Sequence, residues 1–508
     1  MNLLSSASIF SIFTLISRIL GYLRDILIAI FLGTSIFADA FFVAFRLPNT
    51  FRRLFAEGTF NAAFIPSYTS AKLKDKKIGK KFADEVLTII LLILLLIVTL
   101  AEIFTPYLVY IIAPGFITDD IKFNLAVELT RITFPFLLFV SLSSFFSGIL
   151  NSFNKFAAAA AAPIILNVIL IISILFSYIN NFNIAKQLSY GVTIAGIIQL
   201  IFLIYATLSL YKPNFKYNLK ITNKVKFFFK KLLPSIFSSG VTQINILVGT
   251  IIASFQSGAV SYLYYADRVY QINLAIAGIA VGTVSLPVLS KAFKLRNYSK
   301  VINIQNKSIQ LSLLLSIPAS LGLIIASKEI VNGLFGYGSF TQKDVQMTSY
   351  ALVFFGYGII AFALVKIFSN FFFARDNTKT PFYISSFIVF LNVIISVSLF
   401  QKIGFLIIPI ATSISTWVGV LIFLYILKKR NYLMLKYELL KNAIKIILSS
   451  IIMALVLVFL LEKFSDNLAY SYNYKSIYLI IIVSFVGIVY LLSCYLLGLL
   501  KMRNYKTN

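Results

Sequence analysis

The chain has 508 residues, of which 59% are hydrophobic and 12% are charged. This composition is too apolar for a soluble globular protein of this length and predicts a protein that crosses a membrane many times. The chain has no histidine and one cysteine, Cys494, which excludes an intramolecular disulfide, histidine general bases and the usual zinc sites.

Apolar runs of about 20 residues, the length that crosses a bilayer as a helix, recur along the whole chain. No basic region precedes the first run, and it has no clear small-residue cleavage site. We therefore expect it to be a span and not a removed signal peptide. The predicted fold class is an all-α polytopic membrane protein of about fourteen transmembrane helices. The predicted spans are residues 6–32, 35–65, 84–112, 123–149, 158–177, 187–210, 232–255, 260–290, 303–327, 345–373, 381–399, 405–427, 442–461 and 476–500.

The formal charge of +28 is unevenly distributed among the loops between these spans. With the N-terminus in the cytoplasm, the loops on that side carry 28 Lys and Arg and the opposite loops carry 7. The positive-inside rule therefore predicts a multi-pass protein of the bacterial inner membrane with both termini cytoplasmic. The charge reflects topology and contact with anionic lipids, and nucleic-acid binding is excluded. The basic loops are 71–81, 150–157, 211–231, 291–300, 374–380, 428–441 and 501–508, and the opposite loops are 33–34, 113–122, 178–186, 256–259, 328–344, 400–404 and 462–475.

Short sequences recur at an almost constant distance of 221 to 225 residues. The pairs are Leu166-Asn-Val-Ile with Leu391-Asn-Val-Ile, Leu200-Ile-Phe-Leu with Leu421-Ile-Phe-Leu, and Arg46 with Arg268. A repeat of six spans predicts two parallel six-helix lobes that carry a substrate between them. The predicted domains are an N-lobe at 1–211, a basic cytoplasmic linker at 212–231, a C-lobe at 232–430 and two C-terminal helices at 431–508.

Ten basic residues lie inside the predicted spans. Lys307 and Lys445 are near span ends, where their ammonium groups can reach the interface. Arg18 lies about 18 Å into its span at 1.5 Å per residue, too deep to reach either surface easily. A buried arginine costs at least about 2.5 kcal/mol on insertion scales, so such residues persist beside acids or a hydrated cavity.

The first, second and eighth spans contain six arginines and four acids. Arg18 and Asp25 share one helix face, as do Asp39 and Arg46. One interpretation is a set of neutral ion pairs that fix helix packing. The excess of arginine favours the other, a cavity that binds a phosphate-bearing anion. The arginines are Arg18, Arg24, Arg46, Arg52, Arg53 and Arg268, and the acids are Asp25, Asp39, Glu57 and Asp267.

Long motifs occur in order along nearly the whole chain. They are Ser17-Arg-Ile-Leu-Gly-Tyr-Leu-Arg-Asp25, Ala38-Asp-Ala-Phe-Phe-Val-Ala-Phe-Arg-Leu-Pro-Asn49, Arg52-Arg-Leu-Phe-Ala-Glu-Gly58, Ala113-Pro-Gly-Phe116, Tyr264-Tyr-Ala-Asp-Arg268, Leu334-Phe-Gly-Tyr-Gly338 and Ala374-Arg-Asp-Asn-Thr-Lys-Thr-Pro381. With them the chain resembles the lipid II flippase family, MurJ or MviN, of the multidrug, oligosaccharidyl-lipid and polysaccharide exporter superfamily. The resemblance implies transport of lipid-linked peptidoglycan precursor to the periplasmic leaflet by alternating access.

The resemblance also assigns roles to residues. It implies that Arg18, Arg24, Arg52 and Arg268 bind the substrate in a cationic cavity, and that the last two helices form an apolar groove for the polyprenyl tail. Supporting charges are implied at Asp25, Asp39, Arg53 and Glu57.

Two features of the sequence depart from the family pattern. Val269-Tyr-Gln-Ile-Asn273 lacks the Glu-Phe-Pro often found after the arginine of the eighth span. Some members bind sodium through carboxylates on the seventh and eleventh helices, where this chain has no acid. It offers Gln243, Asn245, Asn392 and Ser396 instead. We expect no cofactor or metal, and the energy source stays open between the membrane potential and a cation gradient.

Two other functions are compatible with a polytopic membrane protein of this composition. An exporter of drugs or of other polysaccharide lipids would share the fold, but the arginine excess argues against cationic drugs. A membrane enzyme acting on polyprenyl phosphates would need an acidic metal cluster or a general base. The only adjacent acids of an outer loop, Asp119 and Asp120, are expected to cap the next helix. The expected partners are a polyprenyl-diphosphate-linked precursor, membrane lipids and cell-wall synthesis proteins.

Overall fold

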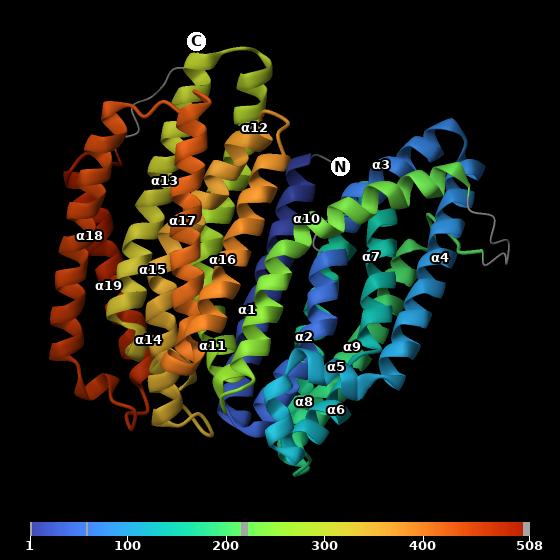
Figure 1. Ribbon diagram of the computed structural model, residues 1–508, viewed down its shortest axis with the longest axis horizontal. Coiled ribbons are helices and arrows are strands. Elements are labelled where there is room, and N and C mark those ends of the chain that lie inside the picture. The colour runs from blue at the N-terminus through green and yellow to red at the C-terminus, as the bar shows by residue number, and fades with distance from the viewer. Residues whose placement is uncertain (1–2, 57–58, 215–221, 501–508) are drawn as a thin grey trace. The chain divides into compact units, whose positions relative to one another are not determined.

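The computed structural model describes residues 3–56, 59–214 and 222–500, and all regular structure in these ranges is helical (Figure 1). The chain divides into two compact units, unit 1 up to Ser261 and unit 2 from Tyr262. Unit 1 contains α1 (Leu3–Leu32), α2 (Ile36–Ala56), α3 (Thr59–Lys74), α4 (Lys76–Ile103), α5 (Thr105–Ile112), η1 (Pro114–Thr118), α6 (Asp120–Thr133), α7 (Phe136–Ser152), α8 (Ala157–Ile179), α9 (Ile184–Thr207), α10 (Asn223–Ala253) and the first turn of α11 (Ala259–Leu274).

Unit 2 continues α11 and contains the rest of the chain. Its elements are η2 (Ala275–Ala280), α12 (Val281–Lys294), α13 (Tyr298–Ile325), α14 (Ser327–Phe335), α15 (Gln342–Phe373), α16 (Lys379–Ile403), η3 (Gly404–Leu406), α17 (Ile407–Lys429), α18 (Tyr437–Lys463), η4 (Asp466–Leu468) and α19 (Lys475–Leu496). The η2 segment, which follows the departure from the family pattern, is a π-helix inserted between α11 and α12. The predicted domain bounds rest on helix count and stay a prediction.

The chain is a multi-pass membrane protein. Ten segments of the described residues are long and apolar enough to cross a membrane, and one of them, Lys379–Lys429, contains both α16 and α17. Every one of the predicted spans overlaps a helix, so the all-helical fold is confirmed. The exact number of fourteen spans stays a prediction.

The predicted loop at 71–81 is wrong in its structure. All of it except Asp75 is helical, because α3 extends to Lys74 and α4 begins at Lys76. The carboxylate of Asp75 caps α4 by accepting a 2.8 Å hydrogen bond from the Lys77 amide. Gly79 lets the two helices meet, since a Cβ there would lie 2.8 Å from the Cα of Lys72. The connection between α3 and α4 therefore consists of Asp75, which caps α4, and the close contact at Gly79 brings the two helices together.

Aromatic side chains fill the core of unit 1. Phe64 stacks on Tyr68 at 5.5 Å and meets Phe145 at 5.1 Å and Phe228 at 6.1 Å between ring centroids.

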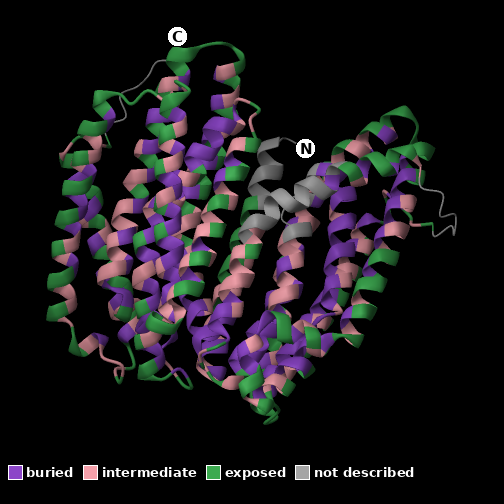
Figure 2. Ribbon diagram, viewed as in Figure 1, coloured by how far each residue is buried: buried purple, intermediate pink, exposed green. Residues whose placement is uncertain are grey.

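Figure 2 shows the buried residues along the inner faces of the helices, while many outer faces are exposed. Exposed apolar side chains on these helices are the expected surface of a protein surrounded by lipid.

Two residues in and beside the predicted linker at 212–231 are hydrogen-bonded to α4. Asp84 accepts a 2.6 Å hydrogen bond from the Tyr211 hydroxyl, and Glu85 accepts one of 2.6 Å from Thr222. Burial, and then the hydrogen bond to Asp84, raise the pKa of Tyr211 above its ordinary value, so the phenol stays protonated and donates. Tyr211, shortly after α9, and Thr222, just before α10, are thus both held by α4.

Candidate functional site

Arg24 of α1 is a buried cation whose hydrogen bonds lie inside unit 1. Its side chain is 7% exposed, and its Nε and Nη2 donate to Oδ1 of Asp25 at 3.0 and 2.6 Å. Its Nη1 donates to Oδ1 of Asn167 on α8 at 2.9 Å. The guanidinium is therefore oriented by one acid and one amide before any ligand binds.

Asn167 is the site residue that the sequence analysis missed. Its amide nitrogen donates to the backbone carbonyl of Ser17 at 2.8 Å, so it joins α1 and α8 while its oxygen accepts from Arg24. The sequence feature that could have indicated Asn167 is that it is a polar residue inside an apolar span, within the repeated Leu-Asn-Val-Ile sequence.

Arg18 is placed differently from Arg24. It lies on the same unbroken helix, seven residues before Asp25, a spacing that places both residues on one helix face. Its side chain is nevertheless exposed. Asp25 forms an ion pair with its neighbour Arg24. Arg18 thus presents its charge at the surface of α1, whereas Arg24 is enclosed.

The remaining predicted residues of unit 1 lie near the end of α2. Nε of Arg52 donates to Oδ1 of Asn49 at 3.0 Å, and Arg53 is half-buried in the last turn. The helix continues through Pro48. Glu57 lies outside the described residues.

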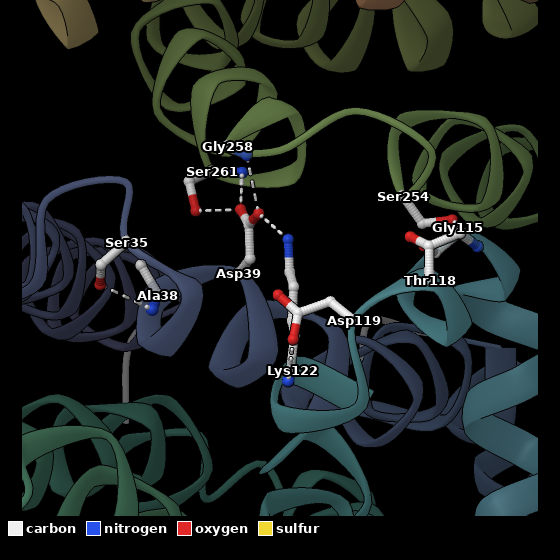
Figure 3. A network of polar contacts seen from close by, with 10 residues as sticks. All are labelled: Ser35, Ala38, Asp39, Gly115, Thr118, Asp119, Lys122, Ser254, Gly258 and Ser261. Carbon is white, nitrogen blue, oxygen red and sulfur yellow. Dashed lines mark hydrogen bonds and ion pairs between the residues drawn. The ribbon is translucent and has the colours of Figure 1, made fainter. Parts of the chain in front are cut away.

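Asp39 of α2 is the acceptor at the centre of a buried polar network (Figure 3). It is 0% exposed and forms an ion pair of 2.6 Å with Lys122, which is also buried. Its two carboxylate oxygens also accept from the amides of Gly258 and Ser261 at 3.0 Å and from the Ser261 hydroxyl at 2.6 Å. Asp39 therefore caps the first turn of α11 from a different helix.

The Ala113-Pro-Gly-Phe116 motif packs against Ser254, close to this polar network. Gly115 donates to the Ser254 hydroxyl at 3.0 Å, and a Cβ at this glycine would lie 2.4 Å from the Ser254 backbone (Figure 3). Asp119 caps α6 by accepting from the Lys122 amide at 3.0 Å, which confirms the predicted cap. Lys122, assigned to an outer loop from the sequence, thus contributes its amide to one carboxylate and its ammonium to another.

Arg268 lies on α11 within unit 2. Its Nη2 donates to the Tyr264 hydroxyl at 2.8 Å, and its guanidinium carbon lies 4.8 Å from the centroid of that ring. Asp267, its neighbour, accepts a hydrogen bond from Gln271 one turn later. The tyrosine holds the guanidinium along the helix by stacking and hydrogen bonding together.

The polar residues of the eleventh predicted span form a closed neutral chain in unit 2. Ser396 donates to Oδ1 of Asn392 at 2.9 Å, and Nδ2 of Asn392 donates to the Thr412 hydroxyl at 2.9 Å. Thr412 in turn donates to the carbonyl of Ile408 at 2.7 Å. Each side chain here is satisfied by its neighbour.

The structure brings together Arg24, Asp25 and Asn167, and separately Asp39, Lys122 and the start of α11. Arg18 and Arg24 share α1, and Arg52 and Arg53 share the end of α2. The convergence of these arginines with Arg268 in one cavity stays a prediction. The arrangement offers guanidinium groups that are held by hydrogen bonds, which suits anion binding.

Sequence comparison identifies what the chain is similar to. A family model described as lipid II flippase MurJ matches residues 28–482, a range that begins after Arg24. A probable lipid II flippase MurJ of Rickettsia prowazekii is 37% identical over 493 residues, covering 96% of this chain and 95% of the relative. One of Rhizobium tropici is 36% identical and covers 90% and 86%.

Solved structures give the same relationship. A lipid II flippase MurJ in an inward closed conformation superposes with a TM-score of 0.83 at 30% identity, covering 96% of this chain and 98% of the other. An inward-facing multidrug resistance MATE family transporter superposes with a TM-score of 0.67 at 14% identity, which indicates a shared fold.

Proposed function

The chain belongs to the lipid II flippase MurJ family, and we propose that it moves lipid II from the cytoplasmic to the periplasmic leaflet by alternating access. The observation that carries this proposal is the likeness, over nearly the whole chain, to a solved lipid II flippase. The membrane is proposed to be the bacterial inner membrane, with both termini in the cytoplasm. Cell-wall synthesis proteins are proposed as partners.

The headgroup of such a precursor carries a diphosphate, and Arg24 has suitable chemistry to bind it. A guanidinium has five N–H donors, and three hydrogen bonds engage it within the described chain. The donors that remain can grip a phosphate while Asp25 and Asn167 hold the plane of the group. Arg18, Arg52 and Arg268 are proposed to complete the anion site, supported by Asp25, Asp39, Arg53 and Glu57.

The polyprenyl tail stays in an apolar environment in this mechanism. We assign it to the outer surface of α18 and α19, where large apolar side chains are exposed, for example Leu455, Phe459 and Ile480. No covalent step is needed to move the lipid, so the chain is proposed not to be an enzyme.

The membrane potential is one proposed energy source. Moving one elementary charge across 100 mV is worth about 2.3 kcal/mol, enough to bias a cationic cavity between two orientations. A cation gradient is the other, and the closed Asn392–Thr412 chain would have to open before its oxygens could coordinate an ion.

The test replaces the arginines one at a time. Arg24→Ala and Arg268→Ala should abolish complementation of a flippase-depleted cell and flipping in defined vesicles, while the protein still accumulates in the membrane. The Lys variants keep the charge but lose the planar fork, so partial activity is expected.

The matched control is Arg430→Ala, which removes an exposed arginine of unit 2. It should leave both membrane level and flipping unchanged. Normal flipping by Arg24→Ala or Arg268→Ala at normal abundance would remove that residue from the site, and loss of abundance in proportion to activity would assign it to folding.

A further inference from the structure

Lys475, the first residue of α19, has a buried ammonium group. The residue is 2% exposed, and its Nζ donates to the carbonyls of Gly336 and Tyr470, each at 2.6 Å. The same nitrogen lies 4.2 Å from the ring centroid of Tyr337 and 4.5 Å from that of Tyr470. Within the described residues no carboxylate pairs with it.

A cation in this position is costly unless its surroundings replace water. Carbonyl oxygens and aromatic faces do so, but they must be held at the right distance. Here they come from two places in the chain, the turn after α14 and the connection before α19. The ammonium therefore fixes α19 to that turn, and an apolar side chain of equal length could not.

Further contacts join the same two segments. Ser476 donates to the carbonyl of Gly333 at 2.5 Å and lies 2.6 Å from the Tyr337 hydroxyl. Gly333 lets α19 approach closely, since a Cβ there would lie 2.6 Å from a methyl of Leu479. Residues 333–340, called here the docking turn, thus receive the start of α19 through charge, hydrogen bonds and packing.

The docking turn also contacts α11. Phe335 and Phe340 are fully buried, and their ring centroids lie 5.1 and 5.2 Å from that of Tyr265. Tyr265 is three residues before Arg268 on the same helix. The docking turn therefore touches the helix of the candidate tail groove and the helix of a candidate headgroup arginine.

We propose that Lys475 is a positioning residue that couples the tail groove to Arg268 through the docking turn. This inference rests on the proposed function, which assigns the tail to α18 and α19. A long tail lying along α19 biases the docking turn, and the turn moves α11. Without the ammonium, the hairpin of α18 and α19 loosens and the tail no longer influences Arg268.

The experiment compares two substrates in defined vesicles. One is lipid II with its full tail, and the other has the same headgroup on a tail of a few isoprene units. Wild type should flip the long-tailed substrate faster. Lys475→Met should lower the long-tail rate by about tenfold, the loss expected for a desolvated cation with two rings and two carbonyls, and leave the short-tail rate unchanged. Lys475→Arg should restore part of the difference.

The control is Lys463→Met, which removes an exposed lysine from the same hairpin. It should keep the wild-type ratio of long-tail to short-tail rates. An equal loss with both substrates in Lys475→Met would mean a purely structural role, and wild-type rates with both substrates would mean no coupling. Either result overturns the proposal. If Lys475→Met does not accumulate, Tyr337→Leu removes one ring face and should shift the ratio in the same direction, and an unchanged ratio overturns the proposal.

Docking is measured separately by hydrogen exchange, which needs no transport. Lys475→Met should speed exchange in the first turn of α19 relative to Lys463→Met, and unchanged exchange overturns the docking itself. If wild type flips neither substrate, the proposed function fails, and the exchange result still decides whether Lys475 docks α19.

Discussion

The guanidinium of Arg24 is held by two groups of different kinds. Asp25 supplies the charge that makes burial tolerable, and Asn167 supplies direction from another helix. Removing an amide that accepts from a buried charged donor leaves that donor unsatisfied, which costs about 1 to 3 kcal/mol. The position of the arginine, rather than its charge, is what Asn167 controls.

Asn167→Leu is therefore expected to lower precursor flipping by about tenfold or more, the factor that corresponds to that cost. The measurement is flipping in vesicles at matched protein level. The matched control is Asn306→Leu, because Asn306 is equally buried at 6% and bonds to backbone groups of Met434 and Lys436 instead of orienting an arginine. Equal losses in both variants would contradict a role specific to Arg24.

Arg24 and Asp25 could be predicted from the sequence because a charge inside an apolar run is visible there. Asn167 could not, since its partner is 143 residues away and an isolated amide within a span has many uses. Lys475 was assigned to an outer loop for a similar reason. Its burial depends on carbonyls and rings that no spacing rule brings together.

The buried carboxylate of Asp39 joins three helices. Asp39 of α2 pairs with Lys122 of α6 and caps α11, so three elements depend on one side chain. Breaking a buried ion pair by removing one partner costs about 3 to 5 kcal/mol, because the other charge is left unpaired. Replacing both partners together removes that cost.

Asp39→Ala and Lys122→Met should each lower the Tm of the purified protein, and Asp39→Asn combined with Lys122→Met should lower it less than either. The control is Glu128→Gln, which breaks the exposed pair with Lys186, whose side chains are 42% and 48% exposed. An exposed ion pair is screened by water and contributes little to stability, so the Tm should barely change. A double variant no more stable than Asp39→Ala would contradict the ion-pair explanation.

The helical type of the elements followed from the apolar runs, but their number and their ends did not. Residues 71–81 read as a loop because they contain six lysines, although lysine is a good helix former and Asp75 provides a cap. Charge density predicts where the chain leaves the membrane, but it gave no information about the local structure of this segment.

The two halves of the chain turn at matching places. Backbone with positive φ recurs after 225, 222 and 223 residues, close to the offsets of the repeated sequences. A left-handed residue is tolerated where a tight turn requires it, so these matches repeat a turn and not a side chain. The pairs are Gly33 with Gly258, Asn154 with Asp376, and Asn181 with Gly404.

The proposed topology can be tested with thiol reagents that do not cross the membrane. Lys76→Cys should be labelled only after permeabilisation, and Thr118→Cys should be labelled in intact cells, since both positions are exposed. Wild type is the control, because its one cysteine, Cys494, is buried and should react slowly. Labelling of residue 76 from outside would contradict the proposed orientation.

Asp39 is synthesised long before the groups that satisfy it. Lys122 follows it by 83 residues and the amide of Gly258 by 219. At about 5 to 20 residues per second, these intervals are about 4 to 17 s and about 11 to 44 s. Both partners of the ion pair are therefore present on the unfinished chain before the amide groups that complete the cap of α11 have been synthesised. During that interval Lys122 is the partner that keeps the carboxylate compatible with its surroundings.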